Sequence, residues 1–400
     1  MKTPPEISCP VCDRRESEPF VQRSVVPVHQ NLLCESQASA HRLARGALNM
    51  HICRHCGFIF NATFDPRLLE YGQQYDNTQT YSATFQEYVG RLIGRLAHLP
   101  EVRRGSIVEV GCGKGGFLRQ LIMAAGPHCQ GHGYDPAYEG AEIDLAGQLH
   151  FHRCFYDPQH AEQQADVVIS RHVIEHVPQP MSLLRSIRRA LAHSPRARVC
   201  FETPCARWIL QHEVVWDFFY EHCSLFTADT LAAAFQLAGF RVESVEHIFG
   251  GQYLWLEAVP GTAVLEPPVP KTGEVLDLAR RFTVRESQLV EHWRRQIVQR
   301  ADRGGVVLWG GGAKGVTFAN LIDPDRRWIV GVVDVNPNKQ GRFLPGSGHR
   351  ILPPAALAHL PVTAAVLLNP NYTEEVTSQL RSLGLDVSVV DLMNESLVAL

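Results

Sequence analysis

The sequence predicts an α/β protein with two doubly wound, mostly parallel sheets and a small metal-binding module ahead of them. Three observations carry this prediction. Residues 106–117 and 306–315 each run from β-forming residues into a glycine-rich turn that opens a helix. Two Cys-x-x-Cys pairs precede the first turn. A chain of 400 residues is also too long for one core, which favours several domains.

The first glycine turn follows the strand-like residues 106–110. Its glycines lack a Cβ and so let the backbone touch a ligand: Gly111, Gly113, Gly115 and Gly116. Glu109 precedes the turn, where a carboxylate can order it and face a cation. Asp135 closes the next strand-like run, about where a ribose-binding acid belongs. This arrangement resembles the class I S-adenosylmethionine (SAM) methyltransferases, with a dinucleotide site as the competing interpretation.

Composition excludes some classes of partner. The apolar fraction of 45% and the charged fraction of 20% are those of an ordinary globular protein. A net charge of -3 gives no attraction to nucleic acid or to an anionic membrane. No apolar run is long enough to span a bilayer, and the first residues do not form a signal peptide. We therefore expect a cytoplasmic protein that binds neither nucleic acid nor membrane, of unknown oligomeric state.

The cysteines indicate a structural metal site. An odd number, eleven, favours reduced thiols over a disulfide framework. Two tight turns place four thiolates for one tetrahedral zinc ion: Cys9, Cys12, Cys53 and Cys56. Such a site is closed and leaves no open position for catalysis. We expect the residues between the two pairs to form a loop that folds back.

A stretch rich in tyrosine and amides, residues 71–88, leads into the first sheet, and its later part begins an amphipathic helix that continues to residue 96. Tyr75 and Tyr81 either cover a ligand or pack against the zinc module. The sequence weighs these two interpretations about equally.

The central domain continues with strands at 149–152 and 166–170. His172-x-x-Glu175-His176 has the spelling of a zinc-peptidase motif, but it follows a strand end directly and Pro178 interrupts any long helix. The segment instead lies at the carboxyl edge of the fourth strand, where ligands bind. We expect Arg171 to contact the cofactor. One of the two histidines is expected to face the acceptor, and at least one to be structural.

Residues 216–227 are aromatic but include Tyr220, Glu221 and His222 in succession. Three polar groups in an apolar run are costly unless they have a role, and histidine beside a carboxylate suits acid–base chemistry. The alternative is a core segment with a satisfied histidine. A helix at 181–191, a strand at 197–202, a capped helix at 227–239 and a hairpin at 240–257 complete a seven-stranded sheet whose last strand is antiparallel.

A proline-rich linker at 258–271 and a charged helix at 274–300 lead to the second glycine turn, at 310–315. A strand ending at Asp334 follows at the ribose-acid distance, and a third strand leads to Asn369. This Rossmann-like unit binds NAD, binds the diphosphate of a substrate at its helix N-terminus, or serves packing alone. We predict a zinc module at 1–65, a methyltransferase domain at 66–258 and the Rossmann-like domain at 272–400.

Taken together, the motifs resemble a family, the sugar C-methyltransferases that methylate C3 of nucleotide-linked 4-keto-deoxysugars. The resemblance spans nearly the whole chain. It rests on the cysteine pairs, the Glu109 turn, His176-Val-Pro178, Glu221-His222, Gly312-Ala-Lys-Gly315, Asn336-Pro-Asn-Lys-Gln-Gly341 and Asn369-Pro-Asn-Tyr372. Two departures stand out. Phe219 occupies the family's expected tyrosine position, with Tyr220 next to it, and Arg171-His172 replaces small and amide residues.

The resemblance implies site residues and a nucleotide-sugar substrate. The catalytic group is His222, Glu221, His176 and Tyr220. The cofactor group is Glu109, Gly111, Gly113, Gly115, Asp135 and Arg171. The substrate group is Tyr75, Tyr81, Lys314 and Asn369.

In the expected reaction, His222 backed by Glu221 removes a proton next to a ketone, and His176 or a tyrosine hydrogen-bonds the enolate oxygen. The alternatives are O- or N-methylation of another small molecule, RNA methylation, an NAD-dependent dehydrogenase and a scaffold without chemistry.

Overall fold

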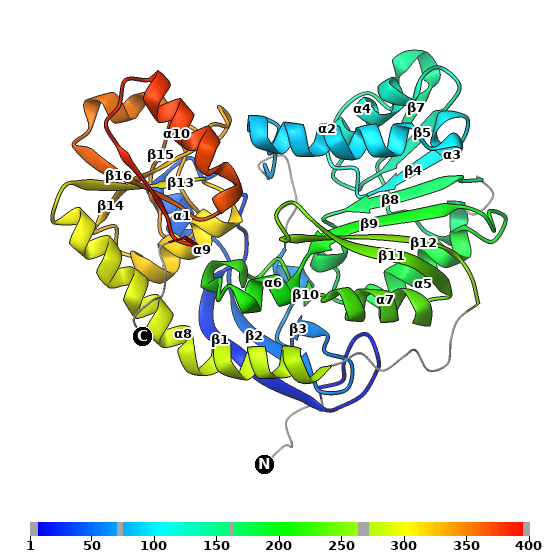
Figure 1. Ribbon diagram of the computed structural model, residues 1–400, viewed down its shortest axis with the longest axis horizontal. Helices are drawn as coiled ribbons and strands as arrows, with labels where there is room; N and C mark the ends of the chain where they lie inside the picture. Colours follow the sequence, from blue (N-terminus) through cyan, green and yellow to red (C-terminus); the bar gives the residue numbers. More distant parts are fainter. Residues whose placement is uncertain (1–6, 70–74, 161–163, 263–271, 395–400) are drawn as a thin grey trace.

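The computed structural model describes residues 7–69, 75–160, 164–262 and 272–394 (Figure 1). Three sheets organise these residues: a four-stranded sheet in the order β1-β2-β3-β10, an eight-stranded sheet in the order β11-β12-β9-β8-β4-β5-β7-β6, and a five-stranded sheet in the order β15-β14-β13-β16-β17. The predicted mixed α/β fold, with a class I methyltransferase-like central sheet, is thereby confirmed. The division at 1–65, 66–258 and 272–400 stays a prediction.

The four-stranded sheet replaces the loop that the sequence predicts between the two cysteine pairs. Its strands are β1 (Ser17–Pro27), β2 (Arg45–Cys53), β3 (Ile59–Asn61) and β10 (Ser224–Leu225), with α1 (Gln37–Arg42) between β1 and β2 and a short turn η1 (Pro66–Leu68) after β3. All of its pairings are antiparallel. The prediction of a loop was wrong because Val21, Leu48 and Met50 bury an apolar face in the molecule's core. Its fourth strand, β10, comes from the middle of the chain.

The central sheet holds eight strands: β4 (Ser106–Val110), β5 (Gln130–Tyr134), β6 (Ile143–Asp144), β7 (Leu149–His152), β8 (Val167–Arg171), β9 (Arg198–Pro204), β11 (Phe240–Ile248) and β12 (Tyr253–Pro260). β7, β5, β4, β8 and β9 pair in parallel, whereas β12 is antiparallel to β9. The predicted seven-stranded arrangement is therefore present. The sequence missed only the two-residue edge strand β6, which is too short to show a pattern.

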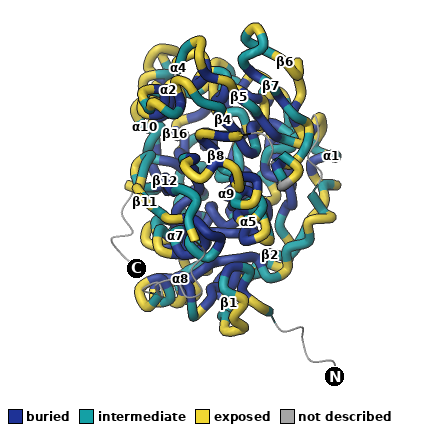
Figure 2. Tube along the Cα trace, turned by 90° about the vertical axis from the view of Figure 1, so that its right-hand side faces the viewer, coloured by how far each residue is buried: buried dark blue, intermediate teal, exposed yellow. Residues whose placement is uncertain are grey.

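Helices cover both faces of the central sheet (Figure 1). Along one face lie α2 (Ala83–Ala97), α3 (Pro100–Arg103) and α4 (Gly116–Ala125), packed on Ile107 and Ile169. Against the other face lie α5 (Pro180–Ala190) and α7 (Ala228–Leu237), packed on Val108 and Val168. Because neighbouring strand residues face opposite sides, the apolar runs of β4 and β8 supply both cores. Figure 2 shows these strands as the buried interior.

The C-terminal sheet is parallel throughout and forms the second Rossmann-like unit. Its elements are α8 (Thr272–Ala301), β13 (Gly305–Trp309), α9 (Ala313–Ile322), β14 (Ile329–Val333), β15 (Ile351–Leu352), η6 (Pro354–His359), β16 (Val362–Leu367), η7 (Pro370–Tyr372), α10 (Thr373–Ser382) and β17 (Ser388–Asp391). A Cβ at Gly315 would lie 2.0 Å from the Gly310 carbonyl oxygen. That close approach of helix to strand explains the last glycine of the turn.

The long helix α8 joins the C-terminal sheet to the N-terminal one. It packs against β1 and against α6 (Ala206–Gln211), and Arg280 forms an ion pair with Glu18 at 2.8 Å. In Figure 1 the N-terminal strands lie beneath both larger sheets. Among the described helices, none combines the length and the apolar character that a membrane span needs.

Candidate active site

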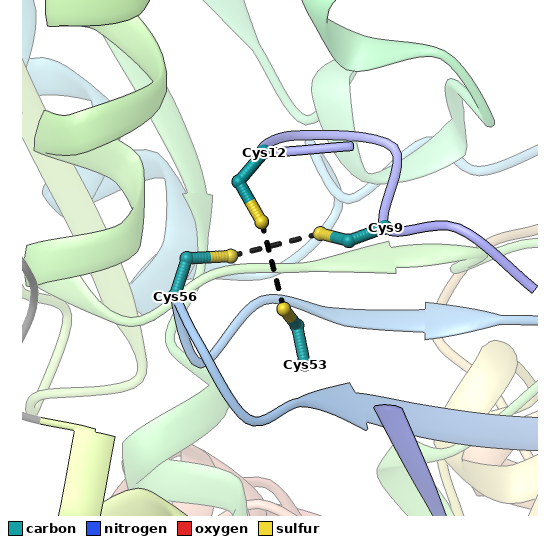
Figure 3. A group of neighbouring side chains, drawn as sticks. All are labelled: Cys9, Cys12, Cys53 and Cys56. Carbon is teal, nitrogen blue, oxygen red and sulfur yellow. Dashed lines mark hydrogen bonds between the residues drawn. The ribbon is translucent and has the colours of Figure 1, made fainter. Parts of the chain in front are cut away.

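The four predicted metal ligands meet in one cluster (Figure 3). The sulfur atoms of Cys9 and Cys56 lie 3.6 Å apart, as do those of Cys12 and Cys53. A tetrahedral zinc ion with Zn–S bonds of 2.3 Å would hold its sulfurs about 3.8 Å apart, so the arrangement fits such an ion. Cys9, Cys53 and Cys56 belong to the same apolar core as Leu231 and Ala234 of α7, and none of the four cysteines lines the cavity described below.

The first glycine turn adopts the backbone that its glycines allow. Gly111, Gly113 and Gly115 have φ values of 74°, 54° and 73°, in the left-handed region. The Asp135 carboxylate accepts hydrogen bonds from the N–H of Gly113 at 2.9 Å and of Ala137 at 2.8 Å. Apart from Gly113 and its two chain neighbours, no atom of the described residues lies within 4 Å of the Cβ position of Gly113, which leaves space there for a ligand.

Two buried polar atoms beside this turn have no protein partner among the described residues. They are Oε2 of Glu109 and Nη2 of Arg171. Burial, opposed by the positive charge of Arg171, raises the pKa of Glu109 to about 8. The Arg171 guanidinium lies over the Phe117 ring at 4.4 Å. A ligand that satisfied both atoms would offer a donor to Glu109 and an acceptor to Arg171, as the ammonium and carboxylate of the SAM methionyl group do.

A cavity of about 300 Å³ opens where the three sheets meet. Among its lining residues are eight side chains singled out above: Tyr75, Tyr81, His172, His176, Glu221, His222, Lys314 and Asn369. The structure thus brings together side chains that are up to 294 positions apart in the sequence (75 to 369). Gly310, Gly312 and Gly315 of the second glycine turn also line the cavity, so this turn and the proposed catalytic residues border the same space.

Residues 215–225, here called the catalytic segment, are held by all three units, and Ser224 Oγ donates to the Val177 carbonyl of the central one at 2.7 Å. Arg23 of β1 donates to the carbonyls of Val215 and Phe218, each at 2.7 Å. From the other side, the Trp216 indole donates to the Leu368 carbonyl at 3.2 Å. The segment ends as β10, paired with β3. The packing of three units therefore fixes the positions of Glu221 and His222.

Desolvation shifts the pKa values of Glu221 and His222 so that each side chain favours its uncharged form. The pKa of Glu221 is raised to about 7 by desolvation, partly offset by hydrogen bonds from the backbone of Gln30 and from Tyr75. The pKa of His222 falls well below its usual value, first through desolvation and then through the nearby His176. His222 is therefore neutral at pH 7 and able to accept a proton. The sequence predicts that Glu221 backs His222. In the structure the Glu221 carboxylate instead accepts a hydrogen bond from the Gln30 N–H at 2.9 Å.

Tyr220 points away from the cavity. Its hydroxyl accepts a hydrogen bond from the Asp65 N–H at 2.8 Å, and its ring fills the space above Gly46. Phe219 takes the place in the cavity wall instead, with its ring centroid 4.0 Å from that of His222. The structure therefore gives Tyr220 a packing role, and we leave it out of the proposed catalytic group.

Glu175, His176 and His222 also lie close enough together to suit a metal ion. However, both oxygens of Glu175 already accept hydrogen bonds, from His172 and Thr203. We therefore assign no metal there.

The second glycine turn repeats the design of the first. The Asp334 carboxylate accepts from the N–H of Gly311 at 2.7 Å, as Asp135 does from Gly113. Buried Lys339 donates to the Gly311 carbonyl at 3.2 Å. Lys314, at the start of α9, forms an ion pair with Asp217 of the catalytic segment. Two lysines and a helix N-terminus thus face the cavity, which suits a phosphorylated ligand.

Comparison with known families agrees with this geometry. Residues 81–245 match the family model described as "Methyltransferase domain", and residues 274–386 match the one described as "C-methyltransferase C-terminal domain". The protein is a SAM-dependent methyltransferase. No curated protein sequence matches this methyltransferase.

Part of this chain is similar to solved structures of other methyltransferases. An O-methyltransferase family protein from Burkholderia thailandensis is 15% identical over 44% of this chain and 57% of its own, with a TM-score of 0.35. Human N-acetylserotonin methyltransferase in complex with SAM is 17% identical over 44% of this chain and 54% of its own, with a TM-score of 0.34. The 1,6-didemethyltoxoflavin-N1-methyltransferase of B. thailandensis, with bound S-adenosylhomocysteine, is 14% identical over 46% and 81%, with a TM-score of 0.33.

Sequence reasoning missed several polar residues of the methyltransferase site. Glu202 is wholly buried at the end of β9, and Gln252 lies between the central and C-terminal units, where it donates to Asn369 at 2.7 Å. Glu202 could have been found, because a carboxylate at the carboxyl end of a parallel strand stands at the ligand-binding edge. Gln252, in a hairpin turn, carries no comparable signal.

Proposed function

We propose that the methyltransferase transfers the SAM methyl group to a carbon next to the ketone of a nucleotide-linked 4-keto-deoxysugar. One observation carries the proposal: the neutral His222 and the second glycine turn, with its lysines, line the same cavity. A sugar between them would present its carbon to the base while its diphosphate meets the turn. The match of residues 274–386 to a C-methyltransferase C-terminal domain supports transfer to carbon.

The residues of the cavity suit enolate formation. His222 takes the proton from the carbon, and the electron pair of the C–H bond moves into a C=C bond as the ketone oxygen becomes negative. His176 lies beside His222, with ring centroids 4.9 Å apart, and is placed to hydrogen-bond that oxygen. SAM, when bound, supplies an electrophilic methyl group, which the carbon takes as S-adenosylhomocysteine leaves. Glu221 is the second candidate base, since its pKa lies near 7.

The cofactors follow from the two sites described. Glu109, Arg171, Asp135 and the first glycine turn would hold SAM, and the cysteine cluster would hold one zinc ion in a structural role.

The direct test is an assay of nucleoside diphosphate 4-keto-deoxyhexoses with methyl-labelled SAM, followed by NMR of the product. We expect a new C–CH₃ group next to the ketone. A methyl group found on oxygen or nitrogen would overturn carbon methylation while leaving SAM dependence intact.

Substitutions in the first glycine turn should weaken SAM binding. Gly113→Val imposes a β-branched residue on a left-handed backbone, at a cost of roughly 1–2 kcal/mol, and fills the open side of the turn. Asp135→Ala removes the carboxylate expected to bind the ribose. We expect each to lower SAM affinity about tenfold or more in titration calorimetry, with metal content unchanged. Unchanged affinity in both variants would show that the cofactor binds elsewhere.

SAM binding should release a proton from Glu109. With its pKa raised to about 8, Glu109 is mostly protonated at pH 7 in the free enzyme. A bound ammonium or sulfonium favours the carboxylate, so the proton leaves on binding, and the release declines as the pH rises through about 8. Calorimetry in buffers of different ionisation enthalpy measures this release. Glu109→Gln should lack this release, and an identical release in both proteins would contradict the assignment.

A further inference from the structure

Four ionisable side chains form a continuous chain of contacts from Arg171, beside the first glycine turn, to Glu175, which lines the cavity. Arg171 Nε donates to Glu202 at 2.5 Å, and the other oxygen of Glu202 faces His172 Nε2 at 2.9 Å. His172 Nδ1 in turn faces a Glu175 oxygen at 3.2 Å. Both glutamates are wholly buried. Positive and negative groups therefore alternate from Arg171 to Glu175.

Charge balance fixes the protonation state of His172. Arg171 neutralises one buried carboxylate, and the second needs another cation nearby. Each ring nitrogen of His172 faces a carboxylate oxygen, which accepts hydrogen bonds, so each nitrogen must carry a proton. Glu202 also accepts from the Tyr88 hydroxyl at 2.6 Å, and Glu175 from the Thr203 hydroxyl at 3.1 Å, so both glutamates are acceptors throughout.

His172 is held in the cavity wall by its backbone as well. Its φ of 53° lies in the left-handed region, which is uncommon for a residue with a side chain, and its N–H donates to the Glu202 carbonyl at 2.9 Å. The ring lines the same cavity as His176 and His222, edge-on to Tyr253 at 4.6 Å. Because both ring nitrogens face glutamate oxygens, His172 can act on a ligand in the cavity through its charge and not through a hydrogen bond from the ring.

We propose that His172 is a positioning residue that remains an imidazolium, and that its fixed positive charge favours the enolate and keeps His222 neutral. The first half of this inference is independent of the reaction, whereas the second half rests on the proposed function. A cation already in place when negative charge develops on the ketone oxygen stabilises that charge without reorganisation. The same cation opposes protonation of a neighbouring histidine.

The pKa shifts of His172 and His222 agree with a charged His172 and a neutral His222. The two glutamates outweigh desolvation and raise the pKa of His172 to about 9. His172 is in turn among the groups that lower the pKa values of His176 and His222, after desolvation. The charged and titratable groups around His172 and His222 come from several elements of the chain. They are Tyr88, Arg171, Glu175, His176, Glu202, Asp217, Glu221, Tyr253 and Lys314.

The test is NMR titration of the histidine side chains in the full-length, ¹⁵N-labelled protein, without SAM or acceptor. Signals are assigned by His172→Asn and His222→Ala, and exposed His128→Asn serves as the matched control. Asn tolerates a positive φ and is neutral, so it removes the charge with little backbone strain. We expect wild-type His172 to stay doubly protonated at pH 8, and the His222 midpoint to rise by about half a pH unit or more in His172→Asn.

A neutral His172 at pH 7.5 would overturn the proposal from the wild type alone, even if the variant failed to fold. An unchanged His222 midpoint in a folded His172→Asn protein would overturn the second half. In the presence of an accepted sugar, His172→Asn should lower kcat for proton exchange about tenfold with little change in KM, and His172→Lys should recover part of it. If the wild type exchanges no carbon-bound proton, the proposed function fails, while the NMR result still decides the charge of His172.

Discussion

His222→Ala is expected to abolish methyl transfer while leaving SAM affinity unchanged. His222 is neutral, lines the acceptor cavity and lies away from the first glycine turn. Removal of a general base typically costs about 10²–10⁴-fold in rate, so we expect a loss of a hundredfold or more. Transfer of the labelled methyl group measures the rate, and calorimetry with SAM measures the affinity.

The role of His222 can be isolated from methylation. An enzyme that forms an enolate should exchange the acceptor proton with D2O in the absence of SAM, and His222→Ala should lose this exchange. His212→Ala is the matched control, because His212 is exposed and lies outside the residues that line the cavity. Exchange that survives in His222→Ala but disappears in Glu221→Gln would make Glu221 the base.

Cys56→Ser is expected to cost most of the protein's stability. If the cluster holds zinc, loss of one of four thiolates weakens a site whose binding can contribute about 10–16 kcal/mol in zinc-finger peptides. Whole domains are stable by only about 5–15 kcal/mol. We therefore expect low solubility, about one zinc ion lost per chain and no activity, measured by metal analysis and thermal unfolding.

Cys34→Ser is the matched control for Cys56→Ser. Cys34 is also buried and precedes α1, but its sulfur faces the Leu32 carbonyl and takes no part in the cluster. Its substitution should leave the zinc content at one. Folded, soluble Cys56→Ser protein with full activity would contradict a structural metal.

Local signals made most of the fold predictable. Most strands of the central sheet and three of the C-terminal one were visible as strand-like runs, and β4 and β13 stood out because each ends at a glycine turn. The short strands β6, β15 and β17 were not predicted. The four cysteines were recognisable as one cluster, because two Cys-x-x-Cys pairs commonly bind one metal ion together. Strand β1 escaped, since its exposed residues, such as Gln22 and Ser24, dilute the apolar pattern.

The arrangement of the site was less predictable, because it depends on contacts that span the chain. The residue types of Glu221 and His222 indicated acid–base chemistry, but Tyr220 and Phe219 differ only in which side of the segment they face. That choice is made by Asp65 and Gly46, which pack against Tyr220. Similarly, the sequence gives no sign that His172 lies between two glutamates, since Glu202 joins it only through the pairing of β8 and β9.

The way the catalytic segment is held has a consequence for how the protein folds. The SAM turn depends on residues 106–135, which are close in sequence and can assemble early. The catalytic segment needs partners from β3, about 165 positions earlier, and from Leu368, 152 positions later. During synthesis it can reach its final conformation only after the C-terminal sheet has emerged from the ribosome. We therefore expect a refolding chain to bind SAM before it can methylate, so the late intermediate carries cofactor but lacks acceptor chemistry.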